Sequence, residues 1–341
     1  ALAMSKLEQG ENARAIAELE KATSLDAKSP QAGILLVMTH LQQKEYDKAL
    51  AAVKTLEKEQ ADNPVVQNLK GGIYLGKENI VNARASFQKA VSLQPAYFPA
   101  VANLAQLDLQ EKNPDAAKKR FETLLETDKK NSQAMVALSN LAASRGQNDE
   151  AKTWLERAIM ENPDAVQPAK LLVAHYLRMG EKQNAMNLAT KQQSINPSNA
   201  EFLELLAQTQ SANGDKQASL ESYNMRAVLM PDSASIQFRI AAVYATMKND
   251  AAASAALRKA LRIDPNYVDA YVALVGLEAK KGNYEESLSI SRQVQKQQMK
   301  SPIGYVLEGD VLIAQKKPEL AVKAYERAIA INKNGPLIIK W

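Results

Sequence analysis

The chain has 341 residues, a net charge of +5 at neutral pH and no cysteine. The lack of cysteine excludes disulfide bonds and thiol chemistry in this sequence, but it does not fix a compartment, because cytosolic and periplasmic proteins can both lack cysteine. No run of about 18 apolar residues is present, so the sequence predicts no membrane-spanning helix.

The predicted elements repeat every 34 residues from Ala15 onward. Ten positions at this spacing hold only small residues: Ala15, Ala49, Ala83, Ala117, Ala151, Ala185, Ser219, Ala253, Ser287 and Ala321. A larger side chain at a close helix crossing overpacks, at a cost of about 1–3 kcal/mol. The series therefore predicts an array of closely crossing helices. Its predicted parts are a partial repeat at 1–29, nine complete repeats in one continuous array at 30–335, and the start of a truncated further repeat at 336–341.

The repeats at 30–63 and 64–97 carry unusual residues in their first helices. His40 occupies the place that Tyr74 holds one repeat later, which predicts a packed imidazole rather than a reactive one. Gly71 and Gly72 lie in the middle of a predicted helix, where each glycine costs about 1 kcal/mol relative to alanine. We expect both glycines to allow close packing.

Residues 151–185 show the two helices of the repeat in order. Two apolar stripes at helical spacing mark them, namely Ala151, Leu155 and Ala158 in one helix and Leu172, Tyr176 and Met179 in the other. Pro163 ends the first helix, and Gly180 is placed to close the second in the left-handed conformation. The same turn position carries Gly10, Gly146, Gly214 and Gly282 in four other repeats, and Lys44, Glu78, Lys112, Lys248 and Lys316 in the remaining five.

With these features the chain resembles the tetratricopeptide repeat (TPR) family, whose period, helix-turn-helix content and aromatic pattern it shares. Phe87, Phe121, Tyr223 and Tyr325 hold the family's aromatic place in the second helix. The resemblance implies an all-α fold, a right-handed TPR superhelix (α-solenoid) of about ten 34-residue helix-turn-helix repeats. It also implies a protein that binds a protein or an extended peptide.

In this family the first helix of each pair lines the inner surface and holds ligands in extended form. The inward-facing places of the middle repeats carry amides and charges, and side-chain amides suit a peptide backbone or sugar hydroxyls because they both donate and accept hydrogen bonds. The candidate ligand-binding residues are Gln133, Asn140, Gln167, Lys170, Arg178, Glu204 and Gln208, with Phe238 and Tyr271 adding aromatic surface. A water-filled groove without a ligand is the alternative interpretation.

Other function classes have little support in the sequence. His40 and His175 are the only histidines and lack partners at ligand spacing, and nucleophile elbows, phosphate-binding glycine loops and HExxH are absent. We therefore expect no catalysis, no metal and no cofactor. Basic residues gather toward the C-terminal end, mostly on second helices, and form either a basic outer patch or a solvated face: Arg258, Lys259, Arg262, Arg292, Lys296 and Lys300. Without interleaved aromatics these predict no nucleic-acid partner.

Residues 98–126 and 162–189 resemble, more narrowly, the TPR-repeat lipoprotein of bacterial PEP-CTERM/exosortase systems, which accompany exopolysaccharide production. This resemblance implies a Gram-negative protein in the periplasm or at the outer membrane, attached to the membrane only through an anchor outside this sequence. The implied function is a scaffold for exopolysaccharide export or PEP-CTERM protein sorting, with an anionic polysaccharide as a second candidate partner. A cytosolic TPR adaptor for an extended peptide is the alternative.

Overall fold

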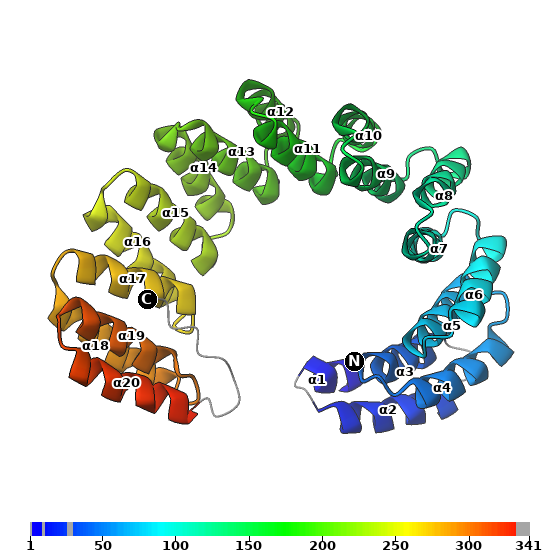
Figure 1. Ribbon diagram of the computed structural model, residues 1–341, viewed down its shortest axis with the longest axis horizontal. Coiled ribbons are helices and arrows are strands. Elements are labelled where there is room, and N and C mark those ends of the chain that lie inside the picture. Colours follow the sequence, from blue (N-terminus) through cyan, green and yellow to red (C-terminus); the bar gives the residue numbers. More distant parts are fainter. Residues whose placement is uncertain (1, 9–10, 26–29, 332–341) are drawn as a thin grey trace. The chain divides into compact units, whose positions relative to one another are not determined.

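The computed structural model describes residues 2–8, 11–25 and 30–331, and in these ranges it contains 20 helices and no strand (Figure 1). The odd-numbered helices are α1 (Leu2–Glu8), α3 (Pro30–Gln42), α5 (Pro64–Gly76), α7 (Phe98–Gln110), α9 (Ser132–Ser144), α11 (Val166–Arg178), α13 (Ala200–Asn213), α15 (Ala234–Thr246), α17 (Val268–Lys280) and α19 (Ile303–Ala314). The even-numbered helices are α2 (Asn12–Leu25), α4 (Tyr46–Glu59), α6 (Ile80–Leu93), α8 (Pro114–Thr127), α10 (Asn148–Glu161), α12 (Lys182–Ile195), α14 (Lys216–Leu229), α16 (Asp250–Ile263), α18 (Tyr284–Gln297) and α20 (Pro318–Ile331). The even-numbered helices begin at intervals of 34 residues throughout, which confirms the predicted all-α array of helix pairs.

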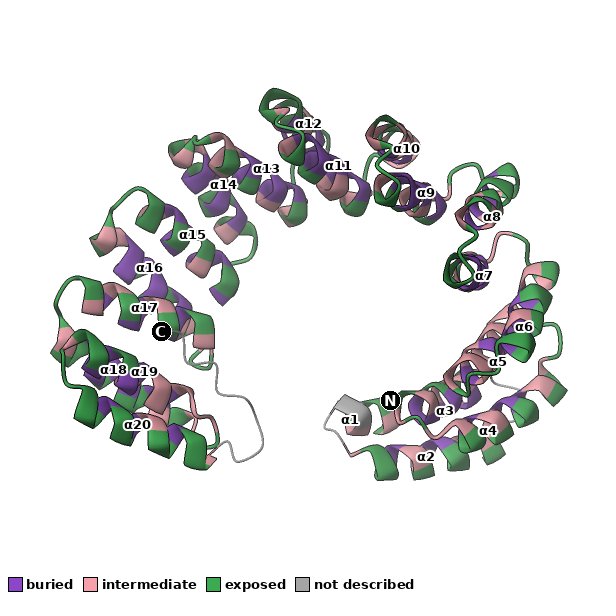
Figure 2. Cartoon of the chain, viewed as in Figure 1, coloured by how far each residue is buried: buried purple, intermediate pink, exposed green. Residues whose placement is uncertain are grey.

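The helices form two compact units, residues 1–168 (unit 1) and 169–341 (unit 2). Within each unit the buried residues lie where neighbouring helices face one another (Figure 2). An apolar core cluster of unit 2 extends from Ala207 to Ala324, and smaller clusters lie in unit 1. The predicted division into 1–29, 30–335 and 336–341 stays a prediction, and residues 336–341 lie outside the described part of the chain.

The ten small residues lie where the helices of a pair cross. All ten are at most 1% exposed. The buried hydroxyls of the two serines among them are hydrogen-bonded. Ser219 Oγ donates to the Ala207 carbonyl at 2.7 Å, and Ser287 Oγ donates to the Val275 carbonyl at 3.2 Å. These positions therefore accept a serine where a backbone carbonyl of the odd-numbered helix is within reach.

In the nine pairs from α3 to α20 the turn has a left-handed residue at the predicted position, and Gly10, predicted for the turn before α2, lies outside the described residues. Gly146, Gly180, Gly214 and Gly282 have φ values between 74° and 91°. Lys44, Glu78, Lys112, Lys248 and Lys316 adopt φ values of 59–61° at the same place, although a side chain there is strained. The helix before Gly180 ends at Arg178, and Met179 is 46% exposed. The prediction that Met179 belongs to the apolar stripe of that helix is therefore wrong, because the helix stops one residue earlier.

One position in the odd-numbered helices holds buried polar residues in several repeats. His40 is 3% exposed, and its Nδ1 lies 2.7 Å from Glu45 Oε2, which fits the packed imidazole expected there. Asp108 occupies this position in α7, where Arg84 Nη1 donates to it at 2.8 Å and Arg120 also binds it. Burial alone would raise the pKa of Asp108, but hydrogen bonds from Arg120 and Arg84 outweigh burial and lower it. These charged pairs join α7 to α6 and α8.

The adjacent glycines of α5 provide the first prediction. A Cβ atom at position 71 would lie 2.4 Å from the buried Phe87 ring, whereas one at position 72 would meet only Leu41 at 3.7 Å. We expect Gly71→Ala to destabilise the protein by about 1–2 kcal/mol through overpacking, and Gly72→Ala to stabilise it by up to about 1 kcal/mol through helix propensity. Urea denaturation of both variants measures this difference, and shifts of the same sign would contradict the assigned packing.

Candidate functional site

The odd-numbered helices of unit 1 form a hollow of about 460 Å³ beside α9. Three of the residues predicted to bind ligand, Gln133, Asn140 and Gln167, line it and are exposed. The floor is apolar and includes Phe98 and Val136. Phe98 is held in place from α7 by stacking on Phe121 of α8, with ring centroids 6.1 Å apart.

This hollow combines an apolar floor with an uncharged hydrogen-bonding rim. Its position follows from the start of α9, where the side chain of Asn131 accepts a hydrogen bond from the Ala134 amide at 2.9 Å and fixes the first turn. Gln133 and Asn140 then project from the exposed side of that helix. The arrangement can receive an apolar side chain while the amides bond to a polar backbone.

In unit 2 the odd-numbered helices form an apolar trough of about 270 Å³ between α15 and α17. Its walls are Phe238, Ala242 and Ala245 of α15 and Ala273, Gly276, Leu277 and Lys280 of α17. Phe238 packs edge-on against Tyr267, at 5.5 Å and 79°. A Cβ atom at Gly276 would have no neighbour within 4 Å, so the trough is open at this glycine. Of the predicted residues, only Phe238 lines the trough.

The other predicted residues of unit 2 already have partners within the chain. Lys170 Nζ lies 2.7 Å from Glu201 Oε2, and Arg178 Nη2 lies 3.1 Å from His175 Nδ1. Gln208 Nε2 donates to Glu204 Oε1 at 3.0 Å. Glu204 also pairs with Arg226 at 2.8 Å. An anionic ligand at Lys170 would therefore compete with a carboxylate of the protein.

Tyr271 was expected to add exposed aromatic surface to the groove, and this expectation is wrong. The residue is 2% exposed, and its hydroxyl donates to Gln297 Oε1 at 2.7 Å. Burial is the main reason why the pKa of Tyr271 is raised. Tyr271 lies on the side of α17 that packs toward α16 and α18, so it belongs to the core and not to the trough.

The sequence interpretation missed the residues that form the trough. It searched inward-facing positions for polar and aromatic side chains, whereas the trough exists because Ala242, Ala245, Ala273 and Gly276 have almost no side chain. A pair of small residues three apart on each of two neighbouring odd-numbered helices was the available signal. That pattern leaves a channel wherever the rest of both helices carries longer residues.

The described residues show neither a metal site nor a membrane span. No group of three or more His, Cys, Asp or Glu residues in this part of the chain could hold a metal ion. None of the described helices has the length and apolar character needed to cross a bilayer.

Comparison with known families identifies the repeat. Two family models, each described as tetratricopeptide repeat, match the chain, one over residues 6–73, 74–133 and 108–176 and the other over residues 234–267 and 304–334. The chain belongs to the tetratricopeptide repeat family. TPR arrays are generally non-catalytic scaffolds whose stacked repeats offer extended surfaces for proteins and peptides. The present chain is a protein-interaction scaffold of this type.

Several solved structures match the chain at low sequence identity. The crystal structure of MamA is 20% identical, with a TM-score of 0.39, and the match covers 48% of this chain and 95% of that one. YrrB, described as a TPR protein with an unusual peptide-binding site, is 20% identical over 57% of this chain and 97% of its own, with a TM-score of 0.39. PilF of Pseudomonas aeruginosa is 20% identical over 61% and 94%, with a TM-score of 0.41. No curated protein sequence matches this TPR chain.

Proposed function

We propose that this TPR protein binds an extended peptide along the exposed sides of its odd-numbered helices. The observation that carries the proposal is the trough between α15 and α17, an apolar channel left open at Gly276. Concave apolar sites with a few polar groups are the usual form of a ligand site. The trough takes apolar side chains of the peptide, and Lys280 at its wall favours a peptide that also carries a carboxylate.

The hollow of unit 1 supports the same mode of binding with different chemistry. Gln133, Asn140 and Gln167 supply donors and acceptors for a peptide backbone around an apolar floor. The two sites differ in that one selects by shape and the other by hydrogen bonds. In both sites the apolar surface receives an apolar side chain of the peptide.

Filling the trough at Gly276 tests the peptide proposal. Gly276→Ile places an aliphatic side chain in open space, so it blocks the trough without disturbing the core. For peptides of about 12 residues selected from a display library on the unmodified protein, we expect about a tenfold loss of affinity, equal to about 1.4 kcal/mol. Isothermal titration calorimetry with the selected peptides measures this loss.

Ala255→Ile is the matched control, because Ala255 is exposed on the even-numbered helix α16. It adds the same side chain on the opposite side of the same repeats and should leave the affinity unchanged. Selected peptides that bind Gly276→Ile as tightly as the unmodified protein would place the ligand outside the trough.

We further propose that the protein acts in the envelope of a Gram-negative bacterium, in the periplasm or at the outer membrane, as a scaffold for exopolysaccharide export or PEP-CTERM protein sorting. Support comes from the resemblance of residues 98–126 and 162–189 to the TPR lipoprotein of those systems. Fractionation of cells that produce the full-length protein tests the location. Recovery in the cytosolic fraction alone would contradict this proposal.

An anionic polysaccharide is the second ligand proposed for the odd-numbered helices, with Lys170 and Arg178 as its contacts in unit 2. Lys170 already pairs with Glu201, but an exposed pair of this kind contributes at most about 1 kcal/mol, so a polyanion can displace Glu201. We expect binding of alginate, a polyuronate, to weaken as salt rises through about 0.15 M, where charges are screened beyond roughly 8 Å.

The same polysaccharide binding should fall about fivefold when Lys170→Ala and Arg178→Ala are combined, since two exposed charged contacts together contribute about 1 kcal/mol. The control combines Lys182→Ala with Lys191→Ala, which removes the same charge from exposed positions of the even-numbered helix α12. Biolayer interferometry with immobilised alginate compares the two variants. An equal loss in both would show that binding depends on net charge and not on this face.

A further inference from the structure

The even-numbered helices of unit 2 carry a separate crevice of about 330 Å³ between α16 and α18. Its floor is apolar, formed by Leu261, Leu274 and Ile290, of which Leu274 and Ile290 are almost fully buried. Arg258 and Arg262 line one side of it. Gln297 lines both this crevice and an adjoining hollow that contains Lys300.

Several cations around this crevice are not neutralised by the protein. Arg258 pairs with Glu286 at 2.8 Å, and Arg292 lies 3.9 Å from Glu308. Lys259, Arg262 and Lys296 are exposed and have no ion-pair partner among residues 30–331. The acidic residues of α16 and α18 lie in the first turns of these helices, whereas the cations lie in their C-terminal halves. Arg258 and Arg262 line the crevice, whereas Arg292 and Lys296 lie beside it on α18, whose polar lining residues are Gln293 and Gln297. We call these four cations the basic rim, and Arg262 and Lys296 in it are free to bind an anion.

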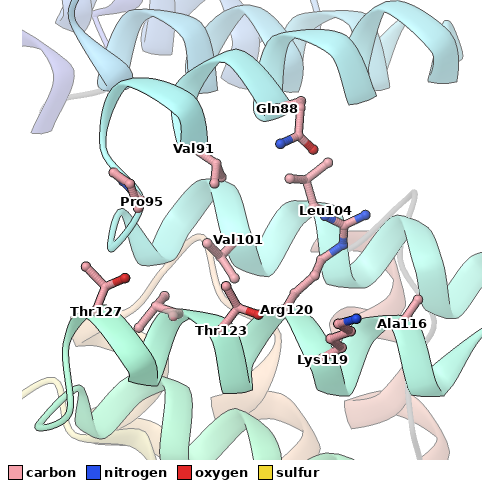
Figure 3. A pocket seen from close by; sticks show the side chains of 11 residues that line it. Gln88, Val91, Pro95, Val101, Leu104, Ala116, Lys119, Arg120, Thr123 and Thr127 are labelled. Carbon is pink, nitrogen blue, oxygen red and sulfur yellow. The ribbon is translucent and has the colours of Figure 1, made fainter.

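Unit 1 contains the equivalent crevice, five repeats earlier in the sequence, between α6 and α8 (Figure 3). It has a volume of about 380 Å³ and an apolar floor that includes Leu104 at the place of Leu274. The rim differs, as Gln88, Ser92, Glu122 and Glu126 stand where unit 2 has Arg258, Arg262, Arg292 and Lys296. Lys119 lines this crevice where unit 2 has Ser289, and Arg120 is bound by Asp108.

The equivalent crevice of unit 1 shows whether the fold requires the cations of unit 2. Cations near helix C-termini interact favourably with the helix dipole, which alone could explain Arg262 and Lys296. The same positions in α6 and α8 carry a serine and a glutamate, yet the helices and the crevice form in the same way. Helix formation therefore does not require the basic rim, which is a property of the unit 2 surface.

We propose that the crevice between α16 and α18 binds an acidic peptide segment that inserts one apolar side chain. The apolar floor of Leu261, Leu274 and Ile290 receives that side chain, and carboxylates on both sides of it pair with Arg262 and Lys296. Stacking of nucleobases requires an accessible aromatic ring, and Tyr271, the aromatic residue that lines this crevice, is 2% exposed. The combination of apolar floor and basic rim therefore favours a peptide over a nucleic acid.

This surface lies on the even-numbered helices, so the proposal is independent of the trough. Exposed charge pairs each contribute little, and the apolar insertion supplies the specificity. Binding should accordingly depend both on salt and on the central side chain of the peptide. Neither dependence alone would distinguish the crevice from a diffuse basic surface.

Fluorescence anisotropy on the full chain tests the proposal with two labelled peptides, each with three glutamates on both sides of a central residue. We expect the peptide with a central leucine to bind at least about tenfold more tightly than the peptide with a central glycine. Combining Arg262→Glu with Lys296→Glu should remove this binding. Both residues are exposed, and thermal melting by circular dichroism checks that the variant stays folded.

Two control variants test whether the loss of binding depends on net charge or on the trough. Lys119→Glu combined with Lys129→Glu makes the same change of charge at exposed positions of unit 1 and should leave the affinity within about twofold. Gly276→Ile, which fills the trough, should also have no effect. Equal losses in the two charge-reversal variants, equal affinities of the leucine and glycine peptides, or tighter binding of oligo-dT than of the leucine peptide would each overturn the proposal.

Discussion

Replacing Ala151 with leucine is expected to lower the free energy of unfolding by about 1–3 kcal/mol, because a longer side chain overpacks a close helix crossing. Ala151 of α10 is 1% exposed, and its carbonyl accepts a hydrogen bond from the buried Ser139 hydroxyl of α9 at 2.9 Å. The two helices approach each other at this point with no space for three further carbon atoms. Urea denaturation monitored by circular dichroism measures the loss.

The neighbouring residue provides the control for this substitution. Lys152→Leu introduces the same side chain one position along, where the residue is only partly buried. Its effect should stay within about 0.5 kcal/mol, as is usual for surface substitutions. If both variants lost the same stability, helix crossing would not be the reason for the small-residue series.

The 34-residue period made the helix array predictable from the sequence. Each repeat needs the same close contact between its two helices, so the small residues return at one spacing from Ala15 to Ala321, and every one of them is buried. The left-handed turn was equally regular. It was predictable even at Lys112 and Lys248, because the positions of the glycines in other repeats defined the conformation.

The candidate site was harder to predict, because it depends on how much each side chain projects and on which side of a helix it lies. Gln133, Asn140 and Gln167 line an exposed hollow, since their helical phase follows from the period, and their role in ligand binding stays a prediction. Tyr271 was predicted to face the groove, but it lies a fraction of a helical turn away and is buried in the core. Composition gave no sign that Gly276 would leave a trough open.

Some equivalent positions of the repeats carry different residues, and these differences have large effects on stability. Glu278 occupies the same position as Tyr176 and Tyr244 and is 3% exposed. Its carboxylate accepts hydrogen bonds from Asn283 Nδ2 at 2.7 Å, from Ser254 Oγ at 2.6 Å and from Lys281 Nζ at 3.0 Å. Burial alone would raise the pKa of Glu278, but these hydrogen bonds outweigh burial and lower it from 4.5 to about 2.

This lowered pKa predicts a specific loss of stability in acid. The folded protein releases the Glu278 proton more readily than the unfolded chain, so the resulting stabilisation is fully present above pH 4.5 and is lost as the pH falls toward about 2. A shift of this size corresponds to about 3 kcal/mol. Glu278→Gln should therefore lower the free energy of unfolding by about 3 kcal/mol at pH 7 and reduce the loss of stability between pH 4.5 and 2.

Glu285→Gln, at an exposed position of α18, is the matched control. It should preserve both the stability at pH 7 and the loss of stability in acid. Urea denaturation between pH 7 and pH 2 compares the three proteins. If Glu278→Gln lost stability in acid as steeply as the unmodified protein, other carboxylates would be responsible for the loss.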